Sequence, residues 1–91
     1  MNIIEELYAV IEDRKANPVE GSYTNYLMDK GVEKIAKKIG EEAVETAIAA
    51  VSNNKADTTG EIADLIYHLL VLMGKMDISL EDIESELRSR R

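Results

Sequence analysis

The sequence predicts an all-α helical bundle, and three observations support this fold class. Apolar residues recur at three- and four-residue spacing in several segments, as in helices with one buried face. Residues that favour helix ends stand at the boundaries of these segments. No segment shows the alternation of apolar and polar residues that is typical of strands. Because the chain has 91 residues, we expect a single all-α domain over 1–91.

The N-terminal part of the chain predicts two helices. Apolar residues with helical spacing occupy 2–16, and the Asn-Pro dipeptide at 17–18 ends this helix, since proline disfavours helical geometry in the residue before it. Ser22 is a suitable N-cap for a short helix over 23–30, and Gly31 suits its end.

Three further helices follow. The segment 32–52 has helical periodicity and ends in small residues, AIAAV, which allow another helix to approach closely. A fourth helix is expected over roughly 57–74, because Thr58 and Glu61 have the spacing of a capping box. Ser79 is a suitable N-cap for a last helix near the C-terminus.

The fourth predicted helix also indicates the quaternary structure. Its LIYHLLVLM segment places apolar residues in every direction around the helix axis, and a helix that is apolar all round is buried all round. A chain of this length offers few elements to cover it. We therefore expect a homodimer whose shared core is a four-helix bundle, built from the third and fourth helices of both subunits.

Composition excludes several classes of partner. With 18 acidic and 11 basic residues, the formal net charge is -7, which disfavours binding to nucleic acid or to anionic membranes. The longest apolar run, Leu65 to Met73, is too short to span a bilayer, and the N-terminus lacks the basic region of a secretory signal. The chain has no cysteine, which fits the cytoplasm.

Two clusters of carboxylates carry the functional signal. Glu41, Glu42 and Glu45 lie in the third predicted helix, and Glu61 and Asp64 lie in the fourth. Like charges three or four residues apart destabilise a helix by about 0.2–0.5 kcal/mol per pair. If the two helices face each other, a cation has to join the acids, and Mg²⁺ prefers such oxygen ligands and bridges them to phosphates. The pattern predicts hydrolysis of a phosphate ester or phosphoanhydride.

Four of the acids also have a purely structural interpretation. Glu41, Glu42 and Glu45 can lie on a solvated helix face, where Glu41 and Glu42 form ordinary ion pairs with Lys37 and Lys38. For Glu61, the alternative is the capping box described above.

Other polar residues are candidates to bind a phosphate-containing substrate. His68 lies one turn after Asp64, where it can bind substrate or orient Asp64, although a lone histidine on an apolar helix also serves as a hydrogen-bonded core residue. Lys34 and Lys38 form a basic stripe that leads to the acids and counters the repulsion of an anionic substrate. Arg14 is a further candidate.

The acidic spacing Glu41-Glu42-x-x-Glu45, followed by Glu61-x-x-Asp64, resembles the metal-binding signature of the all-α MazG-type nucleotide pyrophosphohydrolase superfamily. Further residues resemble one family within it, the phosphoribosyl-ATP pyrophosphohydrolases of histidine biosynthesis. The matching positions are Gly21-Ser22-Tyr23-Thr24, Leu27, Gly31, Lys34-Ile35, Lys38, Gly40-Glu41-Glu42, Glu45, Asp64-Leu65 and Tyr67-His68-Leu69-Leu70.

The resemblance implies hydrolysis of phosphoribosyl-ATP to phosphoribosyl-AMP and pyrophosphate, the second step of histidine biosynthesis. By the same analogy, Mg²⁺ would be bound by Glu42, Glu45, Glu61 and Asp64, and Glu41 would position or deprotonate the attacking water. The family motif adds three candidates for substrate binding, namely Ser22, Tyr23 and Thr24.

Two alternative functions remain open from the sequence. A house-cleaning pyrophosphatase for ordinary or damaged nucleoside triphosphates would use the same acidic signature. A non-catalytic helical dimer that acts as an interaction module would carry the acids only as a charged surface.

Overall fold

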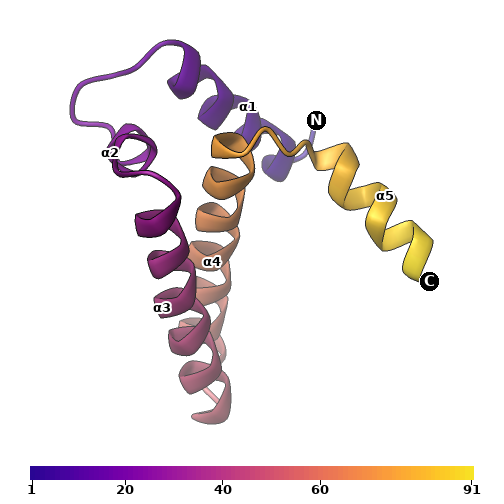
Figure 1. Ribbon diagram of the computed structural model, residues 1–91. Helices are drawn as coiled ribbons and strands as arrows, with labels where there is room; N and C mark the ends of the chain where they lie inside the picture. The colour runs from indigo at the N-terminus through magenta and orange to yellow at the C-terminus, as the bar shows by residue number, and fades with distance from the viewer.

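The computed structural model describes residues 1–91 as five α-helices without a strand (Figure 1). The all-α prediction is confirmed, and the predicted boundaries agree closely except at the start of the fourth helix. The last helix buries no residue and projects from the others (Figure 1). None of the helices has the length and apolar character needed to cross a bilayer. The helices are α1 (Ile3–Ala16), α2 (Tyr23–Lys30), α3 (Val32–Val51), α4 (Lys55–Lys75) and α5 (Leu80–Arg90).

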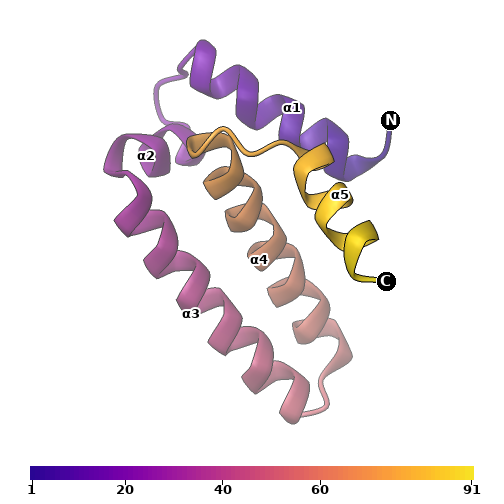
Figure 2. The ribbon, with the colours of Figure 1, turned by 45° about the vertical axis from the view of Figure 1, so that its right-hand side comes forward.

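The two longest helices, α3 and α4, form an antiparallel hairpin that dominates the molecule (Figures 1 and 2). Asn53, in the turn between them, has a φ of 55°. Asparagine is one of the few residues that tolerate this left-handed conformation. The tight turn therefore brings the end of α3 and the beginning of α4 side by side.

The N-terminus of α4 differs from the prediction. Asn54 is the N-cap, and its side-chain oxygen accepts a hydrogen bond from the Asp57 amide at 3.0 Å. The predicted capping box of Thr58 and Glu61 is wrong, because Thr58 lies inside the helix and donates its hydroxyl to the Asn54 carbonyl at 2.7 Å. Glu61 has no capping role and is free to face α3.

The hydrophobic core lies where α1 and α2 pack against one end of the hairpin (Figure 2). Its four fully buried large side chains are Ile11 of α1, Leu27 of α2, Ile35 of α3 and Val71 of α4. Since each of these helices contributes one of them, the core fixes all four helices relative to one another.

The hairpin also leaves some apolar side chains of α3 and α4 uncovered. On α3, Val44 and Ile48 are 59% and 62% exposed, and on α4, Ile62 and Leu69 are 44% and 40% exposed. We call these four residues the apolar strip. Within one chain, other elements thus cover only part of the surface of α4. The expected homodimer, in which a second copy shares this core, stays a prediction.

We expect Ile35→Ala to lower the free energy of unfolding by about 2–5 kcal/mol, because it removes buried methyl groups and leaves a cavity. Ile3→Ala is the matched control, since Ile3 is 69% exposed whereas Ile35 is fully buried, and it should change stability by less than about 0.5 kcal/mol. Urea denaturation of both variants measures the difference. Equal losses in the two variants would contradict this description of the core.

Candidate active site

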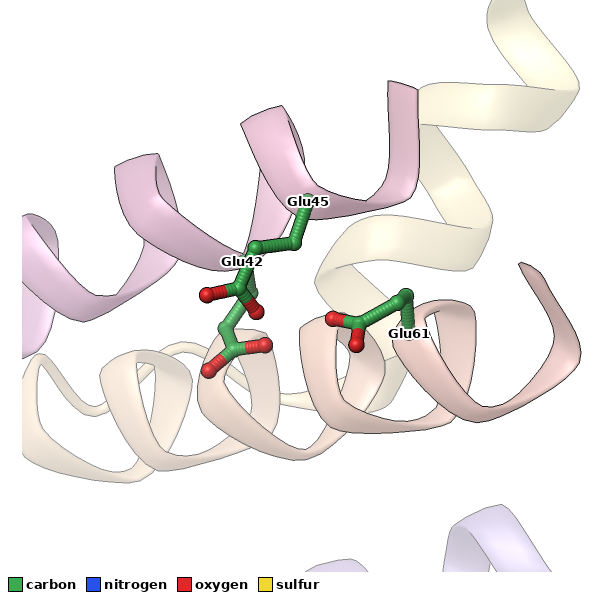
Figure 3. Close-up of side chains that lie close together, drawn as sticks. All are labelled: Glu42, Glu45 and Glu61. Carbon is green, nitrogen blue, oxygen red and sulfur yellow. The ribbon is translucent and has the colours of Figure 1, made fainter. Parts of the chain in front are cut away.

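Three carboxylates from two helices converge between α3 and α4. Glu42 and Glu45 lie one turn apart on α3, and Glu61 lies on the facing side of α4 (Figure 3). One carboxylate oxygen of each lies within 4.8 Å of those of the other two. We call these three residues the carboxylate cluster. The i,i+3 spacing on α3 places two of its acids on one face, and the hairpin supplies the third.

Two oxygens of the cluster lack the partners that buried carboxylates normally have. Glu42 is only 8% exposed, and Oε2 of Glu42 and Oε2 of Glu61 are shielded from solvent without accepting a hydrogen bond. Burying ionised oxygens without partners is costly. A hard divalent cation such as Mg²⁺ is bound by such oxygens and would satisfy them. The residues therefore fit a divalent metal ion.

The close approach of the three carboxylates raises the pKa values of Glu61 and Glu42. The hydrogen bond that protonated Glu61 can make to Glu45 is the largest cause that raises the pKa of Glu61 to about 7, and burial and the charges of Glu45 and Glu42 add to it. The pKa of Glu42 is also raised, first by burial and then by Glu45 and Asp64, while His68 opposes the change. Both shifts disfavour the ionised forms of Glu61 and Glu42 when no cation is bound.

The other two acidic candidates lie beside the cluster rather than within it. The Asp64 residue is exposed, and its charge is near enough to act on Glu42. Glu41 is exposed and forms an ion pair with Lys38, whose Nζ lies 3.4 Å from its Oε1. The structure thus gathers three of the five predicted acids tightly and leaves Asp64 and Glu41 at the rim.

The basic candidates differ in their distance from the acids. Lys38 bridges Glu41 and Glu42, with 3.8 Å from its Nζ to Glu42 Oε1. Burial lowers the pKa of Lys38, but Tyr23, Glu41 and Glu42 outweigh this effect and raise it. Lys34 lies one turn earlier on α3 and is half-buried.

Arg14 belongs to a different part of the molecule, near the end of α1. Its guanidinium pairs with neighbouring Asp13 at 3.2 Å. Its carbonyl oxygen accepts a hydrogen bond from the side chain of Asn25 at 2.8 Å. The structure shows no contact between Arg14 and the carboxylate cluster.

The candidates on α2 are engaged mainly within the chain. Ser22 caps α2 by accepting a hydrogen bond from the Asn25 amide at 3.2 Å. Thr24 is buried, and its hydroxyl lies 2.6 Å from that of Tyr67. The hydroxyl of exposed Tyr23 lies 3.1 Å from His68 Nε2.

Two residues that support this region have no predicted role from the sequence. Buried Asn25 joins α2 to the preceding loop, because its side-chain oxygen accepts the Val19 amide at 2.9 Å while its nitrogen donates to α1. Tyr67 belongs to the matching motif, but its contact with α2 depends on the packing of two helices. The sequence offers one signal for these two roles: Asn25 is a polar residue at a core-facing position of a short helix.

Two open hollows flank these residues. One of about 350 Å³ is bordered by Glu45 and Glu61 and continues along Ile48, Ser52 and Asn54. A larger one of about 630 Å³ lies along α2 and its preceding loop, with Ser22 and Tyr23 in its lining but no residue of the carboxylate cluster. Proximity to the acids makes the smaller hollow the more relevant one for chemistry.

Fold and cluster together define an all-α protein with a carboxylate site between two antiparallel helices. The family model described as phosphoribosyl-ATP pyrophosphohydrolase matches residues 4–91. A phosphoribosyl-ATP pyrophosphatase of Clostridium acetobutylicum is 59% identical over 97% of this chain and 80% of its own length. One of Listeria innocua is 56% identical, over 97% and 84%. This chain belongs to the phosphoribosyl-ATP pyrophosphohydrolase family.

Longer relatives contain a region similar to this chain. The histidine biosynthesis bifunctional protein HisIE of Caldanaerobacter subterraneus is 52% identical over 99% of this chain, which corresponds to 44% of that protein.

The pKa of Glu61 predicts a pH dependence of stability in protein freed of divalent ions by EDTA. Its folded-state pKa of about 7 lies above the ordinary value of 4.5, so its stabilising contribution is complete below about 4.5 and is lost as the pH rises through about 7. Glu61→Gln removes this titration. The variant should therefore gain thermal stability relative to the unmodified chain between pH 5 and pH 8.

Thermal unfolding at both pH values measures this difference. Glu41→Gln is the control, because Glu41 lies outside the cluster, and its relative stability should change little. If Glu61→Gln and the unmodified chain differ in thermal stability by the same amount at both pH values, the raised pKa of Glu61 is contradicted.

Proposed function

We propose that this chain hydrolyses phosphoribosyl-ATP to phosphoribosyl-AMP and pyrophosphate with the help of Mg²⁺, in the second step of histidine biosynthesis. The observation that carries the proposal is the convergence of Glu42, Glu45 and Glu61 from two helices within 4.8 Å, in a chain of this family. The names of its relatives support the substrate.

Mg²⁺ would be held by the carboxylate cluster together with Asp64, which borders it and acts on Glu42. When bound, the ion neutralises charge on the phosphates and lowers the pKa of water. The protein itself supplies position, because acids from α3 and α4 would hold the ion, and through it the phosphates, at one point of the hairpin. Such positioning and charge stabilisation account for most of the catalysis in phosphoryl transfer.

Glu41 is our proposed catalytic residue, which positions the attacking water or accepts its proton. It is exposed at the edge of the cluster, and Lys38 holds its carboxylate. The water oxygen forms a new bond to the α-phosphorus, the bond from that phosphorus to the α–β bridging oxygen breaks, and pyrophosphate leaves. Glu41 takes the proton that the water loses.

Substrate binding is proposed for the residues around this point. Lys38 and Lys34 would attract the phosphates, since they are the cations of α3 that lead to the acids. The α2 region would lie along the rest of the substrate. Direct contact is proposed for Ser22, Tyr23 and Arg14. Thr24 and His68, whose side chains are hydrogen-bonded to Tyr67 and Tyr23, would contribute by holding α2 against α4.

We also propose that the active form is a cytoplasmic homodimer. The apolar strip on α3 and α4 is exposed in one chain, and a second copy that covers it would complete a four-helix core. A net charge of -7 argues against nucleic acid and anionic membranes as partners. The absence of cysteine agrees with a reducing compartment.

An assay of purified protein with phosphoribosyl-ATP, with and without Mg²⁺, tests the proposed reaction by pyrophosphate release. Glu45→Gln and Asp64→Asn should each reduce turnover more than about 100-fold, because loss of even an outer-sphere partner of a metal costs 10–100-fold. EDTA should abolish turnover, and both variants should keep their oligomeric state.

Full activity of either variant would remove its residue from the proposed metal site. Ordinary nucleoside triphosphates, which lack the N1 phosphoribosyl group, are the substrate control. Comparable pyrophosphate release from them would favour a house-cleaning pyrophosphatase. A protein that releases no pyrophosphate from any of these substrates, with or without Mg²⁺, would favour a non-catalytic interaction dimer.

Val44→Lys should shift the protein from dimer to monomer, because it places a charge within the apolar strip. Val19→Lys is the matched control: Val19 is 46% exposed, as an apolar residue of the loop before α2, and its replacement should leave the dimer intact. Sedimentation velocity at low micromolar concentration distinguishes the two states. A stable, active monomer of the unmodified chain would overturn the proposed dimer.

A further inference from the structure

Two consecutive residues of α2 are hydrogen-bonded to two consecutive residues of α4. Tyr23 bonds to His68, with 3.1 Å from hydroxyl to Nε2, and Thr24 bonds to Tyr67, with 2.6 Å between hydroxyls. The rings of Tyr23, Tyr67 and His68 pack together at centroid distances of 6.1, 5.8 and 5.1 Å. We call these four residues the aromatic clasp. It holds the first turn of α2 against α4 one turn beyond Asp64.

The second hydrogen bond of His68 fixes the direction of its bond to Tyr23. His68 Nδ1 lies 2.7 Å from the carbonyl oxygen of Asp64, and a carbonyl oxygen only accepts hydrogen bonds. Nδ1 therefore carries a proton, which leaves Nε2 as the acceptor of the imidazole. The Tyr23 hydroxyl must donate its single proton to Nε2. Because His68 is 5% exposed and both its nitrogens are used, it has no polar atom left for the substrate.

Tyr23 is then restricted in what else it can bind. Its side chain is 45% exposed, and its oxygen keeps acceptor capacity after donating its proton to His68. Ionised phosphate oxygens are acceptors and gain nothing from it. A hydroxyl of a ribose or an amino group of a base is a donor and matches it.

We propose that Tyr23 contacts the nucleoside part of the substrate as a hydrogen-bond acceptor, and that His68 is a positioning residue that enforces this polarity. The inference rests on the proposed hydrolysis of phosphoribosyl-ATP. Asp64 and His68 occupy successive turns of α4, and Tyr23 is bonded to His68. When the phosphates lie at the acids, the adjoining sugar or base of the substrate lies one turn away, near Tyr23. Thr24 and Tyr67 hold α2 in place and do not touch the substrate.

Steady-state kinetics of Tyr23→Phe and of two His68 variants test the proposal. Tyr23→Phe should raise KM for phosphoribosyl-ATP about 5- to 10-fold, as expected for one lost hydrogen bond, with kcat and the Mg²⁺ dependence unchanged. His68→Asn keeps a donor for the Asp64 carbonyl but loses the acceptor for Tyr23, so it should raise KM similarly. His68→Gln can place an amide oxygen at the Nε2 position and should restore KM towards the unmodified value.

A double variant and a matched control sharpen this test. Tyr23→Phe with His68→Asn should raise KM no further than either change alone, because the two residues form one unit. Tyr26→Phe is the control: its ring stacks on Tyr23 at 6.0 Å, but its hydroxyl makes no hydrogen bond within the chain, and KM should not change. An unchanged KM in Tyr23→Phe, a loss in kcat instead, or additive effects in the double variant would overturn the proposal.

A substrate made with 2′-deoxyadenosine identifies the donor. If the adenosine 2′-hydroxyl is the donor, Tyr23→Phe should have no effect on KM with this substrate. A remaining effect would assign the donor to another hydroxyl or to the amino group, and either result supports an acceptor role for Tyr23.

Hydrogen exchange separates this inference from the proposed function. Amides of α2 should exchange faster in Tyr23→Phe than in Tyr26→Phe, since only the former breaks the clasp. If the unmodified chain releases no pyrophosphate from phosphoribosyl-ATP, the proposed function fails, and with it the substrate contact of Tyr23. If turnover is normal but Tyr23→Phe matches the control in KM and in exchange, only the present inference fails.

Discussion

Negative charge held between two helices is the constraint on which this structure depends. Glu42, Glu45 and Glu61 approach within 4.8 Å of one another, with shielded oxygens on Glu42 and Glu61 that accept no hydrogen bond. Such an arrangement opposes folding unless other parts of the protein stabilise the hairpin. The buried core of Ile11, Leu27, Ile35 and Val71 provides this stabilisation at a different part of the hairpin. Stability and chemistry are thus assigned to different parts of α3 and α4.

The neighbouring elements complete the site and relieve only part of its negative charge. Lys38 pairs with Glu41 and Glu42 at the edge of the cluster, where it can also meet a phosphate. The aromatic clasp places the first turn of α2 beside α4. A phosphate-containing substrate would therefore find cations and carboxylates along α3 and a hydrogen-bonding surface on α2. This arrangement suits a reaction in which the protein mainly positions reactants and balances charge.

Local features of the sequence were sufficient to predict most of the fold. Helical periodicity and the caps at Ser22 and Ser79 located α2 and α5, because these signals act over a few residues. The start of α4 was missed, since Asn54 and Thr58 are both good N-cap residues and the tight turn at Asn53 decided between them. The local sequence alone does not distinguish these two N-cap residues.

The site was predictable in composition but not in geometry. Residue spacing placed the acids on facing helices, but the rotation of α3 against α4 determines which of them meet. That rotation leaves Asp64 and Glu41 at the rim. The pairing of Thr24 with Tyr67 likewise depends on contacts between helices that are distant in sequence. Tertiary packing, which no local pattern encodes, decides such details.

The location of a bound divalent cation tests the central claim most directly. Anomalous diffraction from crystals soaked in Mn²⁺, used in place of Mg²⁺, should show a peak between α3 and α4, about 2.1 Å from oxygens of Glu42, Glu45 and Glu61. A structure at saturating Mn²⁺ with no peak there, or with Mn²⁺ only on other surface carboxylates, would contradict it.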